Sequence, residues 1–305
     1  MIIFHADVHA YPGDLNAPLP IALLNVSLEP LRMPLLVFLS GTLVPRSLAK
    51  GKKAYLGGKM RGVLYPYLVW TVILVAVTWL VQSLDGRSIQ WDLVARAIVN
   101  PLGHMWFLAY LLVFYVIAWA TRRVNPALIG AASLSVPLIP AIAAIGYRPF
   151  AMLGFFMLGV ATASTLKETF EALMNSRLLG FVGPLGLAGI MLISSSLWLA
   201  GTPVNPSDVR LAPFTLLFIL WIMKLFKNMP SLGTSSLLGS IGRQSLVYYV
   251  THWPVMMLVG IALSTFPAIL AFVLMIAAAL AIGLLIATAK QRWSAVGALY
   301  AAPRR

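Results

Sequence analysis

The sequence predicts an all-α, polytopic integral membrane protein: a helical bundle of about nine spanning helices plus an N-terminal stub of a tenth. Of its 305 residues, 60% are hydrophobic and only 10% are charged, and the mean hydropathy is +0.91. A soluble domain cannot keep that much apolar surface from water. The apolar residues form successive runs with short connections, so we expect one membrane domain over residues 1–305.

Residues 31–67 change from an apolar segment to a cationic one and back. Residues 33–44 are apolar apart from Ser40, Gly41 and Thr42, which suits a membrane helix with a small-residue contact face. The loop that follows has no acidic residue and carries six cations: Arg46, Lys50, Lys52, Lys53, Lys59 and Arg61. Such a cluster beside a membrane helix marks the cytoplasmic side, so this cationic loop is expected to set the topology.

The chain opens with a few apolar residues, followed at once by polar and turn-forming ones. This opening segment is too short to span a membrane or to serve as a signal peptide, and it looks like the last turns of a helix whose start is absent. Residues 19–29 are mildly apolar. We expect them to lie at the membrane interface, ahead of a first full helix at residues 33–44.

Eight further apolar runs each predict a spanning helix: residues 63–82, 106–121, 127–145, 150–165, 178–200, 211–226, 245–263 and 267–289. Several of them contain Pro or Gly, which membrane helices accommodate when the freed backbone groups find partners. We therefore expect kinked, closely packed helices.

Lys and Arg are distributed unevenly over the two sides of this scheme. Seventeen lie on the side of the cationic loop, and Arg32 stands at a helix entrance. The other side has four: Arg87, Arg96, Arg148 and Arg210. The positive-inside rule then predicts a cytoplasmic C-terminus. It also accounts for the net charge of +14, so no nucleic-acid partner is expected.

Absent residues and motifs restrict the possible chemistry. The sequence has no Cys, which excludes disulfides, thiolate nucleophiles and thiolate metal sites. It has no GxSxG, HExxH or phosphate-loop motif, and no apolar run holds the paired carboxylates that proton-coupled carriers use. We expect no metal, and a catalyst has to come from His, hydroxyl, carboxylate or basic side chains.

All four histidines, His5, His9, His104 and His252, fall toward the non-cytoplasmic half of the predicted topology. His252 lies about two turns inside an apolar helix, where an ionisable group is costly unless it serves a site. A neutral imidazole there can act as a base near pH 7. A hydrogen bond between helices is the alternative for each His, although for His5 and His252 we favour a functional role.

Other polar residues have two interpretations each. Asp7 can orient the His5 imidazole from a loop but not from a continuous helix, where residues two apart do not share a face. Arg32 can pair with Glu29, three residues away, or hold a phosphate or carboxylate of a ligand. The cationic loop, Arg61 included, sets topology and can also attract the phosphates of coenzyme A.

Five tryptophans lie mostly near predicted helix ends: Trp70, Trp79, Trp91, Trp106 and Trp253. Aromatic belts at the two membrane interfaces account for this distribution. We therefore expect no sugar-stacking role for them from position alone.

Five segments together resemble the membrane acyltransferase-3 family. They are FH at Phe4 and His5, RMPLLVFLSG at residues 32–41, the basic segment ending in R-x-x-x-x-P-Y at residues 61–67, HMWFL at residues 104–108, and SLVYYVTHWP at residues 245–254. Their order and spacing agree with the family, and the resemblance covers nearly the whole chain. It is closest to the branch of fucose O-acetylase-like and glucan-modifying proteins.

The resemblance implies a ten-helix enzyme of the bacterial inner membrane. Such an enzyme takes an acyl group, often acetyl, from cytoplasmic acyl-CoA and transfers it to a hydroxyl of an envelope or exported glycan. His5 matches the family's essential histidine, and Arg32 matches a basic residue that holds the donor or the acyl carbonyl. The possible substrate- or cofactor-binding residues are Asp7, Arg61, His104, Trp106 and His252. The expected partners are acyl-CoA, a glycan or glycolipid acceptor and membrane lipid.

This comparison with the family suggests a mechanism and leaves alternatives. His5 would act as general base on the acceptor hydroxyl, while Arg32 or a helix dipole stabilises the oxyanion. The family's first helix begins about 20 residues before the His, a part that this sequence lacks, so a late start codon or an inactive truncated homologue stays open. A transporter or flippase for a lipid-linked or acylated molecule is the competing class, since kinked helices with polar residues also describe a carrier.

Overall fold

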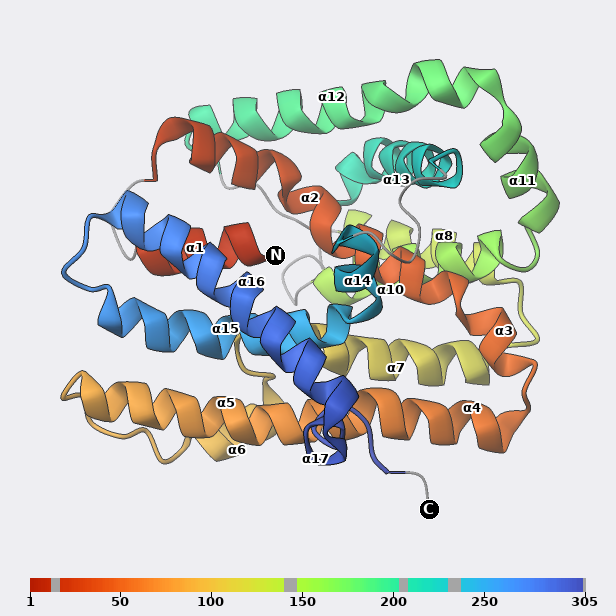
Figure 1. Ribbon diagram of the computed structural model, residues 1–305. Coiled ribbons are helices and arrows are strands. Elements are labelled where there is room, and N and C mark those ends of the chain that lie inside the picture. The colour runs from red at the N-terminus through yellow and green to blue at the C-terminus, as the bar shows by residue number, and fades with distance from the viewer. Residues whose placement is uncertain (12–16, 140–146, 203–207, 230–236, 304–305) are drawn as a thin grey trace. The chain divides into compact units, whose positions relative to one another are not determined.

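The computed structural model (Figure 1) describes residues 1–11, 17–139, 147–202, 208–229 and 237–303. All regular secondary structure in these ranges is helical, and they contain no strand. The prediction of an all-α fold is therefore confirmed.

Seven helical segments in these ranges are long and apolar enough to cross a membrane: Leu19–Leu48, Lys52–Leu84, Gly103–Ala120, Arg177–Leu199, Val209–Lys227, Ser245–Ala262 and Ala268–Arg292. An eighth span results if α10 (Arg148–Thr162) and α11 (Lys167–Asn175) count together, although they meet at an angle of 86°. These helices confirm the polytopic membrane bundle. The ninth expected helix corresponds to a shorter apolar segment, Pro126–Leu138.

This shorter segment consists of α8 (Pro126–Ser135) and a 3-10 turn, η3 (Val136–Leu138). The side chain of Asn125 caps α8 by accepting a hydrogen bond from the Ala127 amide at 2.9 Å. α8 gives way to the 3-10 turn after Ser135, next to Pro137, which has no amide N–H to continue the α-helical hydrogen bonds. Residues 140–145 of the predicted helix lie outside the described ranges.

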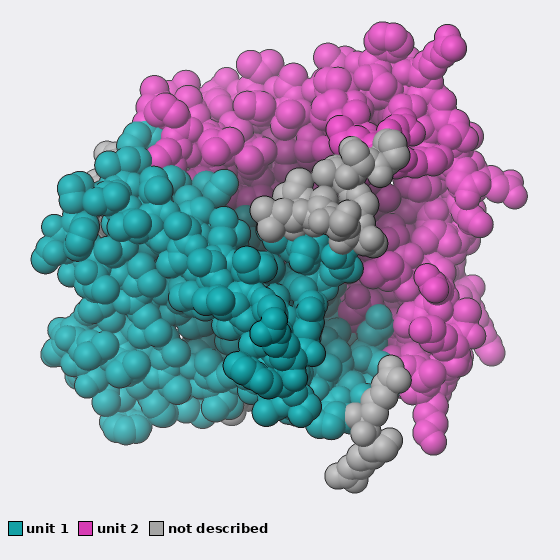
Figure 2. Space-filling view, in the orientation of Figure 1, with its two compact units in different colours: residues 1–18, 57–112, 233–305 teal, residues 19–56, 113–232 magenta. Residues whose placement is uncertain are grey.

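The chain divides into two compact units, coloured separately in Figure 2. Unit 1 comprises Met1–Pro18, Gly57–Leu112 and Gly233–Arg305, and unit 2 comprises Leu19–Leu56 and Val113–Leu232. Each unit therefore combines segments that are far apart in the sequence. The expectation of a single membrane domain over residues 1–305 stays a prediction.

Unit 1 is built around the helix α15 (Ser245–Ala262). This helix packs against α1 (Ile2–Ala10), α5 (Tyr65–Leu84) and α16 (Ala268–Arg292), and α1 also packs against α16. The remaining short helices of this unit are η1 (Met60–Leu64), α6 (Leu93–Val99), η2 (Gly103–Met105), α14 (Leu237–Arg243) and α17 (Ser294–Gly297). The N-terminal segment is thus anchored by helices from the C-terminal part of the chain.

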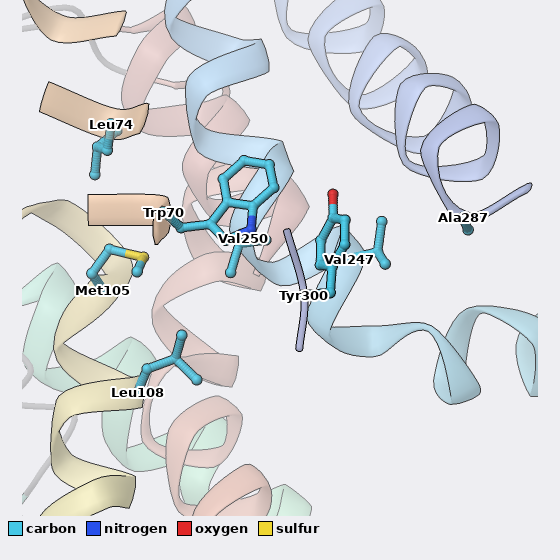
Figure 3. Packing of buried hydrophobic residues seen from close by; sticks show 8 residues of the cluster. All are labelled: Trp70, Leu74, Met105, Leu108, Val247, Val250, Ala287 and Tyr300. Atoms are coloured by element: carbon cyan, nitrogen blue, oxygen red, sulfur yellow. The ribbon is translucent and has the colours of Figure 1, made fainter. Parts of the chain in front are cut away.

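An apolar core joins these helices (Figure 3). Its buried members are Trp70, Leu74, Met105, Leu108, Val247, Val250, Ala287 and Tyr300. Trp70 is only 6% exposed, and its indole N–H donates to the Leu299 carbonyl at 3.1 Å. The interpretation of Trp70 as an interfacial residue is therefore wrong, because its ring fills the core and its one donor is satisfied within the protein.

Unit 2 contains the helix α2 (Leu19–Thr42), which packs against α10, α12 (Arg177–Leu199) and α13 (Ala212–Lys227). A Cβ atom at Gly41 would lie 2.1 Å from the Phe156 carbonyl oxygen of α10. A Cβ at Gly159 would lie equally close to the Phe38 carbonyl oxygen of α2. The predicted small-residue contact face is therefore confirmed, since only residues without a side chain permit this approach.

The start of α2 corrects a prediction. Residues 19–29 do not form a separate interfacial segment, because α2 runs without a break from Leu19 and includes Pro30 and Pro34. Two polar residues of this stretch, Asn25 and Ser27, are buried within unit 2. Ser27 shares a hydrogen bond of 3.2 Å with Ser195 of α12, and Asn25 accepts hydrogen bonds from Arg32. Because these polar groups have hydrogen-bond partners inside the protein, they can be buried as part of α2.

The cationic loop is also largely helical, which the charges alone did not indicate. It contains α3 (Val44–Leu48) and α4 (Lys52–Lys59), separated by a turn at Gly51 with a φ of +86°. α4 continues through η1, a π-helical turn, into α5. Tyr55 anchors α4, because its side chain is fully buried and its hydroxyl donates to the Tyr115 carbonyl at 2.9 Å.

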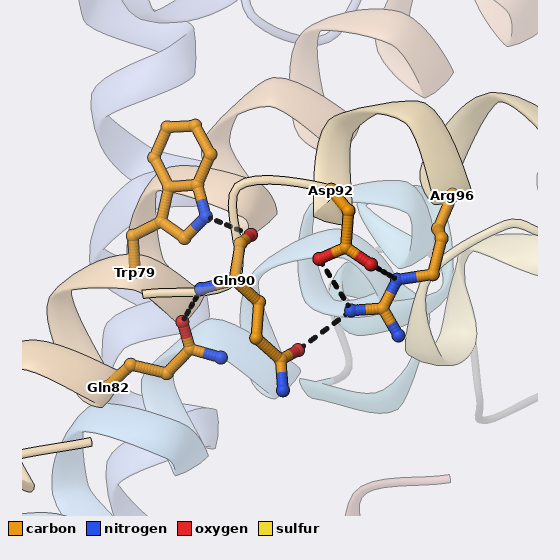
Figure 4. Close-up of polar contacts among 5 residues, drawn as sticks. All are labelled: Trp79, Gln82, Gln90, Asp92 and Arg96. Carbon is orange, nitrogen blue, oxygen red and sulfur yellow. Dashed lines mark hydrogen bonds and ion pairs between the residues drawn. The ribbon is translucent and has the colours of Figure 1, made fainter. Parts of the chain in front are cut away.

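The connection after α5 is held by side-chain hydrogen bonds (Figure 4). Trp79 donates to the Gln90 carbonyl at 3.0 Å, and the Gln90 amide donates to Gln82 at 3.1 Å. Arg96 forms an ion pair with Asp92 at 2.9 Å. Arg87 and Arg210 likewise pair with Asp85 and Asp208. Arg87, Arg96 and Arg210, all assigned to the non-cytoplasmic side, therefore carry a carboxylate partner.

Candidate functional site

The N-terminal helix α1 carries two histidines on one face. His5 and His9 are four residues apart, which puts them on adjacent turns of the same side of the helix. Their rings lie edge-on to Trp253 of α15, with ring centroids 4.6 Å and 5.0 Å from that of the indole. The packing of α1 on α15 and α16 holds His5 in the interior, where it is 8% exposed.

His104 is positioned by the tight turn η2. Gly103 has a φ of +48°, in the left-handed region that favours glycine, and a Cβ there would lie 3.3 Å from the Trp253 ring. The hydroxyl of Tyr249 donates to the His104 carbonyl. The His104 ring stacks on Trp253 at 5.6 Å and is 2% exposed. The backbone and the ring of His104 are thus both held by α15.

His252 lies on α15 itself and is 1% exposed. Its ring nitrogen Nδ1 is 2.9 Å from the carbonyl oxygen of Tyr248, one turn earlier. Tyr248 in turn packs against Gly283 of α16, where a Cβ would lie 2.4 Å from the tyrosine ring. Close packing of two spanning helices therefore supports the residue that orients His252.

His5, His104 and His252 together form what we call the histidine cluster. Their ring centroids are separated by 5.1 Å (His5 to His252), 4.9 Å (His104 to His252) and 6.4 Å (His5 to His104). Five of their six ring nitrogens are buried and have no hydrogen-bond partner among the described residues: both of His5, both of His104, and Nε2 of His252. An unsatisfied buried polar atom costs about 1–3 kcal/mol, so a bound hydroxyl or water would find ready partners here.

The electrostatic environment of α1 keeps its histidines neutral. Burial lowers the pKa of His5 far below its usual range, and the neighbouring rings of His252 and His104 lower it further. Burial also lowers the pKa of His9. A neutral imidazole has one nitrogen without a proton, which is the form required of a general base.

The other predicted site residues lie elsewhere in the two units. Asp7 is two residues after His5 in the continuous helix α1, so the two side chains point to different sides. The Trp106 ring, at the start of α7 (Trp106–Ala120), packs against Tyr110 at 5.2 Å. Arg61 donates to the Ala302 carbonyl at 3.0 Å, and in unit 2 Arg32 donates to the Asn25 carbonyl at 3.1 Å. Of the predicted site residues, the structure therefore brings together the side chains of His5, His104 and His252.

Sequence reasoning missed Tyr249 and Trp253. Trp253, which we expected only at a membrane interface, contacts the rings of His5, His9 and His104. Their spacing in the sequence indicates a shared site, because Tyr249, His252 and Trp253 stand at positions i, i+3 and i+4 of one helix and so share a face. Among the residues that the structure describes, no group of three or more His, Asp or Glu could hold a metal ion.

The spanning helices and the buried imidazoles define an integral membrane protein with the groups needed for general-base chemistry. Residues 1–288 match the acyltransferase-3 family model, described as an acyltransferase domain. The chain therefore belongs to the acyltransferase-3 family and is a membrane acyltransferase, which confirms the resemblance at the level of the family. No curated protein and no solved structure matched the chain in the corresponding comparisons.

Proposed function

We propose that this chain is an O-acyltransferase that moves an acyl group, of acetyl size, from cytoplasmic acyl-CoA to a hydroxyl of an envelope or exported glycan. The observation that carries this proposal is the histidine cluster, with five ring nitrogens that lack a hydrogen-bond partner among the described residues, in a chain of the acyltransferase-3 family. The donor, the glycan acceptor and the fucose O-acetylase-like branch are drawn from the resemblance of the five sequence segments.

His5 acts as the general base in this proposal. Its unprotonated ring nitrogen takes the proton of the acceptor hydroxyl while the hydroxyl oxygen attacks the thioester carbonyl. The carbon–sulfur bond then breaks, and the proton passes to the departing CoA thiolate, so the reaction is balanced without a further reactant. Arg32 or a helix dipole stabilises the negative charge on the carbonyl oxygen. The proposed transfer is direct between substrates, since the chain has no Cys and no Ser in a GxSxG nucleophile motif; a relay through an acyl-histidine or acyl-serine is the alternative.

The remaining candidates serve the two substrates. The cations of α3, α4 and η1, Arg61 among them, attract the phosphates of coenzyme A from the cytoplasm. Asp7, His104 and Trp106 contact the acceptor or the acyl group, and His252 lies beside the base, with its ring centroid 5.1 Å from that of His5. The chain lies in a bacterial inner membrane with its C-terminus in the cytoplasm, which gives the donor access from the side where acyl-CoA is made.

A comparison of two histidine variants tests the base. Membranes with the wild type, with His5→Ala or with His9→Gln are supplied with labelled acetyl-CoA and envelope glycans. We expect His5→Ala to lower the rate about 100-fold or more, the range for a lost general base. His9→Gln should keep most of the rate, although it lies on the same face of α1. Equal rates in all three samples would contradict the assignment of His5.

The competing carrier function predicts a different result. A transporter or flippase would move a lipid-linked or acylated molecule across vesicles without consuming acyl-CoA. Purified protein in liposomes, given acyl-CoA and acceptor, separates the two. Transport without any cleavage of the thioester would overturn the acyltransferase proposal.

A further inference from the structure

Within the histidine cluster, the protein fixes the proton position of His252. Its Nδ1 lies 2.9 Å from the Tyr248 carbonyl oxygen, which can only accept a hydrogen bond. Nδ1 therefore donates and carries the proton. In the neutral imidazole the other nitrogen, Nε2, is then bare and can only accept.

The other two rings of the cluster are not fixed in this way. Neither ring nitrogen of His5 or of His104 has a hydrogen-bond partner among the described residues. Tyr249 holds His104 through its backbone carbonyl, which leaves the choice of protonated ring nitrogen open. Within the described part of the cluster, His252 is therefore the ring with a proton position set by the protein.

His252 is close enough to His5 to determine, through a hydrogen bond, which ring nitrogen of His5 carries the proton. The two ring centroids are 5.1 Å apart, and the Nε2 of His252 is buried without a partner among the described residues. Two imidazoles joined by an N–H···N bond of about 2.9 Å have centroids roughly 5 Å apart. A rotation of one ring, or a single bridging hydroxyl, connects His5 to the bare nitrogen.

We propose that His252 is a positioning residue: its Nε2, kept bare by the Tyr248 carbonyl, accepts a hydrogen bond from a His5 N–H and thereby leaves the other His5 nitrogen free to take a proton. This inference rests on the proposed function, in which His5 is the base. The order of bonds is the Tyr248 carbonyl, the His252 ring, the His5 ring and the acceptor hydroxyl. His252 keeps its own proton throughout, so the balance of the acyl transfer is unchanged.

The buried position of His252 explains why an imidazole, and not a carboxylate, is suited to accept the hydrogen bond from His5. A carboxylate in the same position would bring a buried negative charge into a membrane protein, at a large cost in desolvation. A neutral imidazole accepts the same hydrogen bond without a net charge. The orientation of the His252 ring comes from the Tyr248 carbonyl of the α15 backbone, and the Tyr249 ring lies beside it, with centroids 6.2 Å apart.

Two substitutions of His252 separate positioning from packing. In His252→Gln the amide oxygen reaches near the place of Nε2 and can accept, whereas His252→Asn imitates Nδ1 and leaves that place empty. We expect kcat to fall about 100-fold in His252→Asn and less than about 10-fold in His252→Gln, with KM for acyl-CoA nearly unchanged in both. Equal losses in the two variants, or no loss in His252→Asn, would overturn the proposal.

The control variant is Thr251→Val. Thr251 is equally buried and also bonds to the carbonyl one turn earlier, that of Val247, but it has no ring contact with the cluster. We expect it to retain kcat. A loss as large as in His252→Asn would show that disturbance of α15, rather than the missing acceptor, lowers the rate, and would overturn the proposal.

Nitrogen-15 NMR of the full chain, labelled at histidine and reconstituted in lipid, tests the same point without any substrate. We expect His252 to carry its proton on Nδ1 and His5 to occupy one tautomer, which becomes a mixture in His252→Asn. A proton on Nε2 of His252, or an unchanged His5 signal in the variant, would overturn the inference. Because this measurement needs no acyl transfer, it decides the inference even where the proposed function fails.

Discussion

For the individual residues of the histidine cluster, single hydrogen bonds fix the geometry. The Tyr249 hydroxyl binds the carbonyl of His104, and Gly103 supplies the left-handed turn that brings this ring against Trp253. None of these side chains is charged. The cluster is therefore arranged by neutral donors and acceptors, which are less costly than charges inside a membrane protein.

Removal of the Tyr249 hydroxyl tests this arrangement. We expect Tyr249→Phe to lower the free energy of unfolding by about 1 kcal/mol, because the His104 carbonyl loses one of its donors while the aromatic packing stays. The acyl-transfer rate should fall with it, about 10-fold, as His104 loosens. Thermal unfolding in detergent and the initial rate measure the two effects. Unchanged values of both would show that this hydroxyl has no role.

The pH dependence of stability follows from His5 and His9. Burial, and for His5 also the neighbouring His252 and His104, lowers the pKa of these groups in the folded protein. As the pH falls below about 6.5, the unfolded chain binds protons that the folded protein does not. The stabilisation is thus fully present above that pH and is lost on acidification, by up to about 1.4 kcal/mol per pH unit for each histidine.

Unfolding temperatures between pH 8 and pH 5 measure this effect. We expect the temperature to fall toward pH 5 in the wild type and to fall less steeply in His5→Gln, which cannot take up the proton. The same slope in both proteins would mean that His5 is not the source of the pH dependence.

At the scale of the element, glycines decide how closely the helices pack. Gly283 of α16 lies against the ring of Tyr248, the residue with the carbonyl that orients His252. In an isolated helix Ala would be favoured over Gly by about 1 kcal/mol. Here a Cβ would lie 2.4 Å from the ring, so one of the two helices would have to move.

We therefore expect Gly283→Ala to lower the unfolding temperature and the acyl-transfer rate together. Gly260→Ala is the matched control, because the new Cβ would lie 3.4 Å from the end of the flexible Met275 side chain. That substitution should leave the stability unchanged or raise it. A Gly283→Ala protein as stable as the control would contradict the close packing of α15 and α16.

The sequence predicts the type of the elements better than their bounds. The small-residue face at Gly41 was predictable because small residues in a membrane helix indicate a close contact. The start of α2 at Leu19 was not, because Asn25 and Ser27 look interfacial until their partners, Arg32 and Ser195, are known. In the same way, the pairing of His5 with His252 depends on contacts between segments far apart in the chain. Spacing along one helix, as for Trp253, could have revealed only part of the site.

At the scale of the whole molecule, the distribution of cations predicts the orientation. Because the chain has no Cys, single cysteines introduce the only thiols. We expect Ala49→Cys, at an exposed position between α3 and α4, to react only with reagents that reach the cytoplasm. Ser88→Cys, exposed in the connection after α5, should react from outside in intact cells. The reverse pattern would contradict the predicted topology.

Acyl transfer from one side of the membrane to the other, with His5 as the base, can be measured in vesicles of defined orientation. Vesicles with purified wild-type or His5→Ala protein receive labelled acetyl-CoA on the side of Ala49 and an envelope glycan on the side of Ser88. We expect label on the glycan hydroxyls with the wild type and about 100-fold less with His5→Ala. Equal labelling by both proteins, or none by the wild type with any envelope glycan offered, would contradict it.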